Sequence, residues 1–110
     1  SNIELNIIGR SKDIIIKGGI NISPNYIESL LIQNKDINDC CVYPIQDNIY
    51  GEIIGCTIVP TDINFDKKKL LLSIKSKLPN NLIPDKINFI EKLPKTISGK
   101  VIKSELIQMS

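Results

Sequence analysis

The chain has 110 residues, of which 42% are hydrophobic and 24% charged, and its formal net charge is +2. This balance is typical of one globular domain and disfavours a disordered or disulfide-built chain. No apolar run approaches the roughly 20 residues that cross a bilayer, which disfavours a membrane-spanning chain. The absence of histidine excludes a Ser-His-Asp triad and the most common general base and metal ligand. Any chemistry must therefore depend on lysine, arginine, carboxylates, backbone amides or bound ligands.

The N-terminal part of the chain predicts a β-hairpin followed by a helix. The segments 14–17 and 20–22 flank Gly18-Gly19, and glycines supply the positive φ angles of a tight primed turn. Ser23 is a good N-cap and Pro24 a good first helical residue, and apolar residues recur at helical spacing after them. We expect a turn tip of bare backbone and a helix of about ten residues.

Two strands that contain the cysteines are predicted next. The segments 39–45 and 52–59 are rich in β-branched residues and are separated by turn residues, so we expect them to pair. Cys40, Cys41 and Cys56 lie in these strands without the spacing of a metal site. We interpret them as reduced core residues and predict no metal site.

The C-terminal half predicts two helices and one strand. Asp66 can cap a helix whose apolar residues lie three and four apart. We interpret the run Lys67 to Lys69 as a solvated helix face and not as a nucleic-acid site, because few aromatic residues lie near it to stack on bases. A short strand is expected over residues 86–90 and a short terminal helix around residues 101–106.

Together these elements predict a single α+β domain over residues 1–110. A small mixed β-sheet with an N-terminal β-hairpin should be covered by about three helices. No signal peptide is recognised, so we expect a cytoplasmic location. Because a fold of this kind does not specify a function, the functional prediction depends on two short segments.

The first segment is Pro94-Lys95-Thr96-Ile97-Ser98-Gly99-Lys100. Gly99 allows a close approach of the backbone to a ligand, and Thr96 and Ser98 can fix the loop through hydrogen bonds. Ser98-Gly99-Lys100 alone is typical of an ordinary surface turn, but the whole heptad resembles a signature of the adenylate-forming (AMP-binding) superfamily, which includes acyl- and aryl-CoA synthetases, luciferases and peptide-synthetase adenylation domains. The resemblance implies that Lys100 is catalytic and contacts the substrate carboxylate and the α-phosphate of ATP. Such a mobile charge lowers the barrier because carboxylate attack brings two anions together.

The second segment, residues 9–19, resembles the crossover motif between body and lid in the same superfamily. The resemblance implies a hinge near residues 10–13, with Lys12 as the pivot, and a Gly18-Gly19 loop that lines the pantetheine tunnel after the lid has rotated. Arg10 is the only arginine in the chain, and its guanidinium suits bidentate recognition of phosphate or ribose. Taken alone, Arg10 is equally compatible with an ordinary surface ion pair.

The resemblance implies the C-terminal lid of an ATP-dependent carboxylate–CoA ligase, most like an acyl- or aryl-CoA synthetase. ATP and coenzyme A would be substrates, with Mg²⁺ in the full enzyme, and a large N-terminal body would supply the ATP and carboxylic acid sites that this chain lacks. We expect the isolated domain to bind no cofactor and to be inactive, because one lysine supplies only part of such a site. Two alternatives remain: the lid of a peptide-synthetase adenylation domain that loads a carrier protein, and a free-standing lid-fold module that docks on a separate body subunit.

Overall fold

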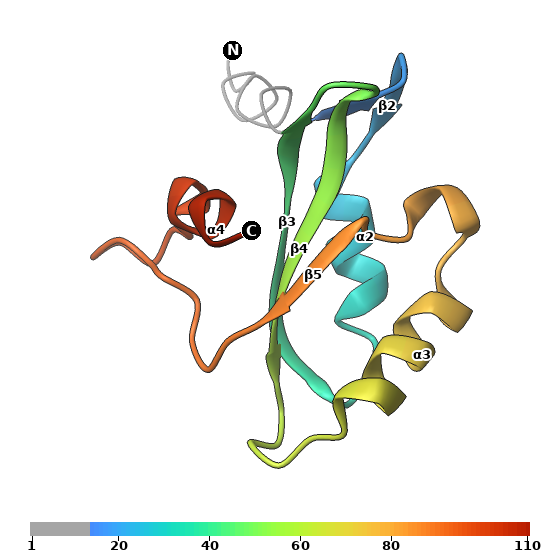
Figure 1. Ribbon diagram of the computed structural model, residues 1–110. Helices are drawn as coiled ribbons and strands as arrows, with labels where there is room; N and C mark the ends of the chain where they lie inside the picture. The colour runs from blue at the N-terminus through green and yellow to red at the C-terminus, as the bar shows by residue number, and fades with distance from the viewer. Residues whose placement is uncertain (1–13) are drawn as a thin grey trace.

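The computed structural model describes residues 14–110 and confirms the predicted α+β fold (Figure 1). The elements in chain order are β1 (Ile15–Lys17), β2 (Ile20–Ile22), α2 (Pro24–Leu31), β3 (Ile37–Asp47), β4 (Gly51–Pro60), α3 (Lys67–Lys77), the 3₁₀ helix η1 (Asn80–Leu82), β5 (Lys86–Phe89) and α4 (Lys103–Met109). The first predicted helix has 8 residues, slightly fewer than the roughly ten expected, and ends at Leu31 with Ile32 as its C-cap. No helix in the described part of the chain is long and apolar enough to span a membrane.

The five-stranded sheet is mixed and is organised around β4. β3 pairs with β4 in antiparallel fashion along nearly its whole length, as predicted, from Ile37 opposite Pro60 to Asp47 opposite Gly51. The other edge of β4 is shared by two short strands: β1 is antiparallel to it at Lys17, and β5 is parallel to it further along. β2 completes the sheet as the antiparallel partner of β1.

Helices cover both faces of the sheet. α2 and α3 lie on one face and α4 lies on the other (Figure 1). The larger core lies beneath α2 and α3 and the smaller one beneath α4, and side chains of β3 alternate between them because neighbouring residues of a strand point to opposite faces. Val42 belongs to the larger core, and Cys41 and Tyr43 belong to the smaller core.

Local capping residues fix the N-terminal ends of the two longer helices, α2 and α3. The Ser23 hydroxyl accepts a hydrogen bond from the Tyr26 amide at 3.2 Å, and the Asp66 carboxylate accepts one from the Lys69 amide at 3.2 Å. Both residues were predicted as caps, since their side chains satisfy amides that have no partner within the first turn. A longer-range contact then joins α2 to the sheet, because the Glu28 carboxylate accepts a hydrogen bond of 2.7 Å from an amide of β3.

The cysteines occupy the predicted core strands as free thiols. Cys41 and Cys56 are buried and Cys40 is partly buried. Burial is the largest cause that raises the pKa of Cys40 and of Cys41 to about 12, and the nearby Glu28 carboxylate acts in the same direction. Burial also raises the pKa of Cys56. These thiols are therefore protonated at neutral pH and contribute to packing as small apolar groups.

Candidate functional site

The heptad singled out in the sequence forms a closed loop between β5 and α4, here called the lysine loop (residues 94–102). Lys95 and Val101 face each other in an isolated antiparallel bridge. Within that bridge, the Thr96 amide donates a hydrogen bond of 2.8 Å to the Lys100 carbonyl. The loop therefore turns back on itself like a miniature hairpin, which places Lys100 on its returning limb.

Hydrogen bonds inside the lysine loop converge on Thr96. Its carbonyl accepts a bond of 2.9 Å from the Gly99 amide, and its hydroxyl accepts one of 3.1 Å from the Lys100 amide. The Thr96 and Ser98 hydroxyls lie 2.9 Å apart and are hydrogen-bonded. Gly99 has a φ of 91°, a value that side chains other than hydrogen rarely tolerate. The expected fixing of the loop by Thr96 and Ser98 is therefore confirmed, whereas their contact with a ligand stays a prediction.

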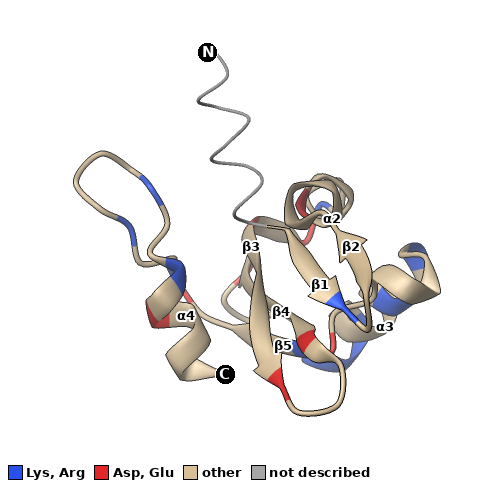
Figure 2. Ribbon diagram, turned by 90° about the horizontal axis from the view of Figure 1, so that it is seen from above, with Lys and Arg blue, Asp and Glu red and all other residues tan. Residues whose placement is uncertain are grey.

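The base of the lysine loop is anchored and its far end is exposed. Leu93 and Leu106, which flank the loop in sequence, are both buried in the smaller core. Lys95 forms an ion pair of 3.4 Å with Asp39 of β3. Figure 2 shows the loop extending away from the sheet beyond α4, and Lys100 is exposed on it. The ammonium group is thus free to approach an anionic ligand held by another surface.

The second candidate element is the glycine tip, Gly18-Gly19, between β1 and β2. Both glycines are exposed and have φ angles of 58° and 84°, as the sequence predicts for a primed turn. A Cβ atom added to Gly19 would have no neighbour within 4 Å. The tip is therefore bare backbone, and one hydrogen bond of 2.8 Å joins the Gly18 amide to the Tyr50 carbonyl in the β3–β4 turn.

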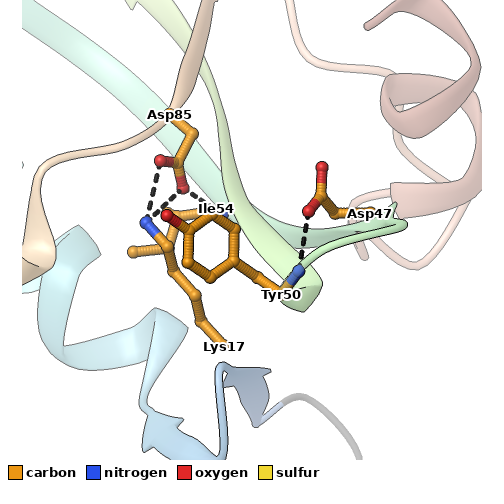
Figure 3. Close-up of polar contacts among 5 residues, drawn as sticks. All are labelled: Lys17, Asp47, Tyr50, Ile54 and Asp85. Carbon is orange, nitrogen blue, oxygen red and sulfur yellow. Dashed lines mark hydrogen bonds and ion pairs between the residues drawn. The ribbon is translucent and has the colours of Figure 1, made fainter.

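A polar cluster that the sequence did not predict surrounds Lys17, the residue before the glycine tip (Figure 3). Lys17 Nζ lies 2.8 Å and 3.1 Å from the two carboxylate oxygens of Asp85, and 5.3 Å from the ring centroid of Tyr50. Asp85 Oδ2 also accepts a hydrogen bond of 2.8 Å from the Ile54 amide. Lys17 and Asp85 are 68 residues apart, and no local sequence signal links them.

The structure does not bring the glycine tip and the lysine loop together. The tip projects from the β1–β2 edge of the sheet, whereas the loop projects beyond α4 (Figures 1 and 2). One fixed orientation of the domain therefore cannot present both elements to the same small ligand. Two further predicted site residues, Arg10 and Lys12, lie outside the described residues together with the predicted hinge.

A family model for the C-terminal domain of AMP-binding enzymes matches residues 26–100. The chain belongs to this family. The match contains the lysine loop up to Lys100 and begins after the glycine tip. The family match confirms the resemblance to the adenylate-forming (AMP-binding) superfamily that the two sequence segments indicated.

The relatives that match this AMP-binding domain are longer proteins with names of acyl-activating enzymes and CoA ligases. The chain is 37% identical over 114 residues to the probable acyl-activating enzyme 8 of Arabidopsis thaliana, a match of 96% of this chain and 20% of the relative. It is 34% identical over 101 residues to a feruloyl-CoA synthase of Amycolatopsis sp., covering 91% of this chain and 21% of the relative. The acyl-CoA synthetase of Brucella canis superposes with a TM-score of 0.76 at 29% identity, over 92% of this chain and 19% of the other. The chain thus spans about a fifth of the length of the relatives it matches.

Proposed function

We propose that the chain is the C-terminal lid of an ATP-dependent carboxylate–CoA ligase, which forms an acyl-adenylate and then a thioester. The observation that supports this most directly is Lys100, exposed on a hydrogen-bonded loop at the end of the segment that matches the AMP-binding family. The names of the relatives, a feruloyl-CoA synthase and a 2-methylpropanoate–CoA ligase among them, favour coenzyme A over a carrier protein as the acceptor. We place the enzyme in the cytoplasm.

In the first half-reaction, Lys100 would act on ATP and a carboxylic acid held by a separate N-terminal body. Attack of the carboxylate on the α-phosphate forms a new P–O bond and releases pyrophosphate. Negative charge from both reactants accumulates around the α-phosphate, and the Lys100 ammonium stabilises that charge electrostatically. The short hydrogen-bonded loop limits the freedom of the lysine backbone, which leaves only the side chain to be ordered on binding.

ATP, coenzyme A and Mg²⁺ would be bound by different parts of the complete enzyme. ATP and coenzyme A are substrates of the proposed ligase. We assign its Mg²⁺ to the ATP phosphates and the body, because residues 14–110 present no group of three or more histidine, cysteine or carboxylate side chains placed to hold a metal ion. Thr96, Ser98 and Gly99 would border the nucleotide as neighbours of Lys100, and Arg10 would contact its phosphate or ribose.

In the second half-reaction, the lid would rotate about the segment 10–13, with Lys12 as the pivot. The separation of the glycine tip from the lysine loop supports this step, since only a rotation could exchange one element for the other at a single active site (Figure 2). Rotation withdraws Lys100 and presents Gly18 and Gly19 beside the path of the thiol. A tip without side chains leaves room for a narrow pantetheine arm. The thiolate sulfur then attacks the acyl carbon, and AMP leaves with the electron pair of the broken C–O bond.

The test is the Lys100→Ala variant of the complete enzyme, with Lys92→Ala, an exposed lysine just before the loop, as the matched control. The carboxylic acid is first chosen by ATP–pyrophosphate exchange with a panel that includes ferulate and 2-methylpropanoate. Lys100→Ala should lower exchange by about 10²-fold or more, the scale typical of one lost electrostatic donor. It should leave thioester formation from supplied acyl-adenylate near the wild-type rate, and Lys92→Ala should preserve both reactions. Equal loss of both half-reactions in Lys100→Ala would refute this division of labour.

The coding sequence upstream of Ser1 tests the alternative that the chain is a free-standing module. A phosphate-binding loop and a ribose-binding aspartate encoded in frame before Ser1 would place body and lid in one enzyme. A start codon at this point would favour a separate subunit, and pull-down of a body subunit would then identify its partner. The isolated domain should show no pyrophosphate exchange in either case, because it lacks the positioning that the reaction needs.

A further inference from the structure

The β1–β2 hairpin has few backbone contacts with the remainder of the sheet. β1 pairs with β4 at a single position, Lys17 opposite Gly51, and β5 occupies the same edge of β4 from Gly55 onward. Between these contacts the edge is covered by one residue, Asp85. Its amide donates a hydrogen bond of 2.8 Å to the Ile54 carbonyl, and its carboxylate accepts one of 2.8 Å from the Ile54 amide. Asp85 therefore replaces a missing strand at this point.

The same carboxylate also binds the last residue of β1. Lys17 Nζ contacts both oxygens of Asp85, and the two side chains are only 23% and 30% exposed (Figure 3). Partial shielding from water makes this pair stronger than a fully exposed one. The Tyr50 ring lies beside the ammonium group, and the Tyr50 carbonyl accepts a hydrogen bond from Gly18. Asp85 and the Tyr50 ring thus hold Lys17, and the Tyr50 carbonyl holds the next residue, Gly18.

The glycine tip has no side chains through which its position could be fixed. Within 4 Å, a Cβ atom on Gly19 would meet nothing and one on Gly18 would meet only the Tyr50 ring. The position of the tip is therefore set by the backbone of β1 and by the Tyr50 hydrogen bond. Lys17 holds that backbone through its side chain, and the Ile16 amide holds it through a hydrogen bond of 2.8 Å to the Glu52 carboxylate. The ion pair between Lys17 and Asp85 closes the gap between β1 and β5 and restrains that backbone.

We propose that Lys17 and Asp85 are positioning residues for the glycine tip, and that their ion pair sets the width of the coenzyme A path during thioester formation. The inference rests on the proposed function, in which the tip borders the thiol. Neither residue needs to touch the substrate, because both act through the backbone of the tip. The lysine loop has its own anchor, because Leu93 and Leu106 are buried in the smaller core, so adenylation should not depend on this ion pair.

The test uses the complete enzyme and three substitutions of the pair: Lys17→Met, Lys17→Arg and Asp85→Asn. The Asp85→Asn side chain keeps an oxygen that can accept from the Ile54 amide while it loses the charge. Lys86→Met is the control, because Lys86 is an exposed lysine adjacent to Asp85 and forms no ion pair with another residue of the described chain. The substrates are coenzyme A and the carboxylic acid that supports pyrophosphate exchange.

We expect Lys17→Met and Asp85→Asn to lower kcat/KM for coenzyme A by about tenfold, mainly through KM. A displacement of about 1 Å costs on the order of 10²-fold, and the remaining hydrogen bonds of Gly18 and Ile16 should keep the shift of the tip smaller than that. Pyrophosphate exchange should stay within about twofold of wild type. Lys17→Arg should restore most of the coenzyme A dependence because it retains the ion pair. An unchanged KM for coenzyme A, or an equal fall in both half-reactions, would overturn the proposal.

Hydrogen–deuterium exchange separates this inference from the proposed function. The amides of residues 15–22 should exchange faster in Lys17→Met and Asp85→Asn than in wild type and Lys86→Met, while those of β3 stay protected. If wild-type enzyme shows no pyrophosphate exchange with any acid, the proposed function fails, but faster exchange at the tip still supports its restraint by the ion pair. Unchanged exchange in both variants would refute the positioning role whatever the activity.

Discussion

Gly55 of β4 occupies a position where no side chain fits, and Gly55→Ala should therefore destabilise the domain. A Cβ atom at this position would lie 2.5 Å from Ile45 Cδ1, 2.8 Å from Ile45 Cγ1 and 2.6 Å from Tyr43 Cε1. All three distances are well below ordinary carbon–carbon contact. Ile45 is only partly buried and can turn away, but the Tyr43 ring is fully buried.

The size of the destabilisation depends on the interactions that the Tyr43 ring would lose if it moved. Its hydroxyl lies 2.7 Å from the hydroxyl of the fully buried Thr57. Overpacking of a core costs about 1–3 kcal/mol, and an unsatisfied buried polar group costs about 1–3 kcal/mol more. We expect Gly55→Ala to lower the free energy of unfolding by about 2–6 kcal/mol, a large share of the roughly 5–15 kcal/mol typical of a domain.

Urea denaturation followed by circular dichroism measures this change. The midpoint should fall while the slope stays constant, because the extent of the folded surface is unchanged. The double variant Gly55→Ala with Ile45→Ala is the matched control, since it removes two of the three close contacts. Its destabilisation should be smaller than the sum of the single effects. A Gly55→Ala midpoint equal to that of wild type, or strict additivity in the double variant, would refute the packing argument.

Three further predictions concern the lysine loop, the attachment of α2 and the thiols. Thr96→Val in the complete enzyme should lower pyrophosphate exchange by about tenfold through loss of loop hydrogen bonds worth roughly 0.5–1.5 kcal/mol each, whereas Thr96→Ser should retain it; equal rates would contradict a role of Thr96 in holding Lys100. Glu28→Ala should lower the unfolding free energy by about 1–3 kcal/mol because a β3 amide loses its acceptor, and Glu28→Gln should lose less in the same urea titration. The pKa of Cys40 and Cys41 is raised to about 12 in the folded chain. The two protonated thiols therefore add to the free energy of unfolding below about pH 9, and this contribution is lost as the pH rises toward 12. At pH 8 a disulfide reagent should label the denatured chain at least about 10²-fold faster than the folded one, and equal labelling rates would contradict this burial.

Much of the fold could be predicted from the sequence because its signals act over a few residues. Gly18-Gly19 specifies a primed turn through positive φ angles, and Ser23 and Asp66 satisfy amides only three residues away. The lysine loop is equally local, because Thr96 forms its bonds with residues up to Lys100. Strand bounds were less certain: β3 begins two residues earlier and ends two residues later than the predicted segment 39–45.

Only the tertiary structure decided which segments share the edge of β4. The choice depends on burial of both sheet faces beneath helices, to which residues from the whole chain contribute, and no local pattern specifies it. The ion pair of Lys17 with Asp85 exists because β1 and β5 meet along that edge, although the residues are 68 positions apart. Gly55 likewise lies inside the predicted strand 52–59 with no local signal of its role, and the need for glycine follows from the side chains of β3 that face it. The sequence by itself thus determined the turns, the caps and the candidate catalytic loop, whereas long-range packing determined how the glycine tip is held.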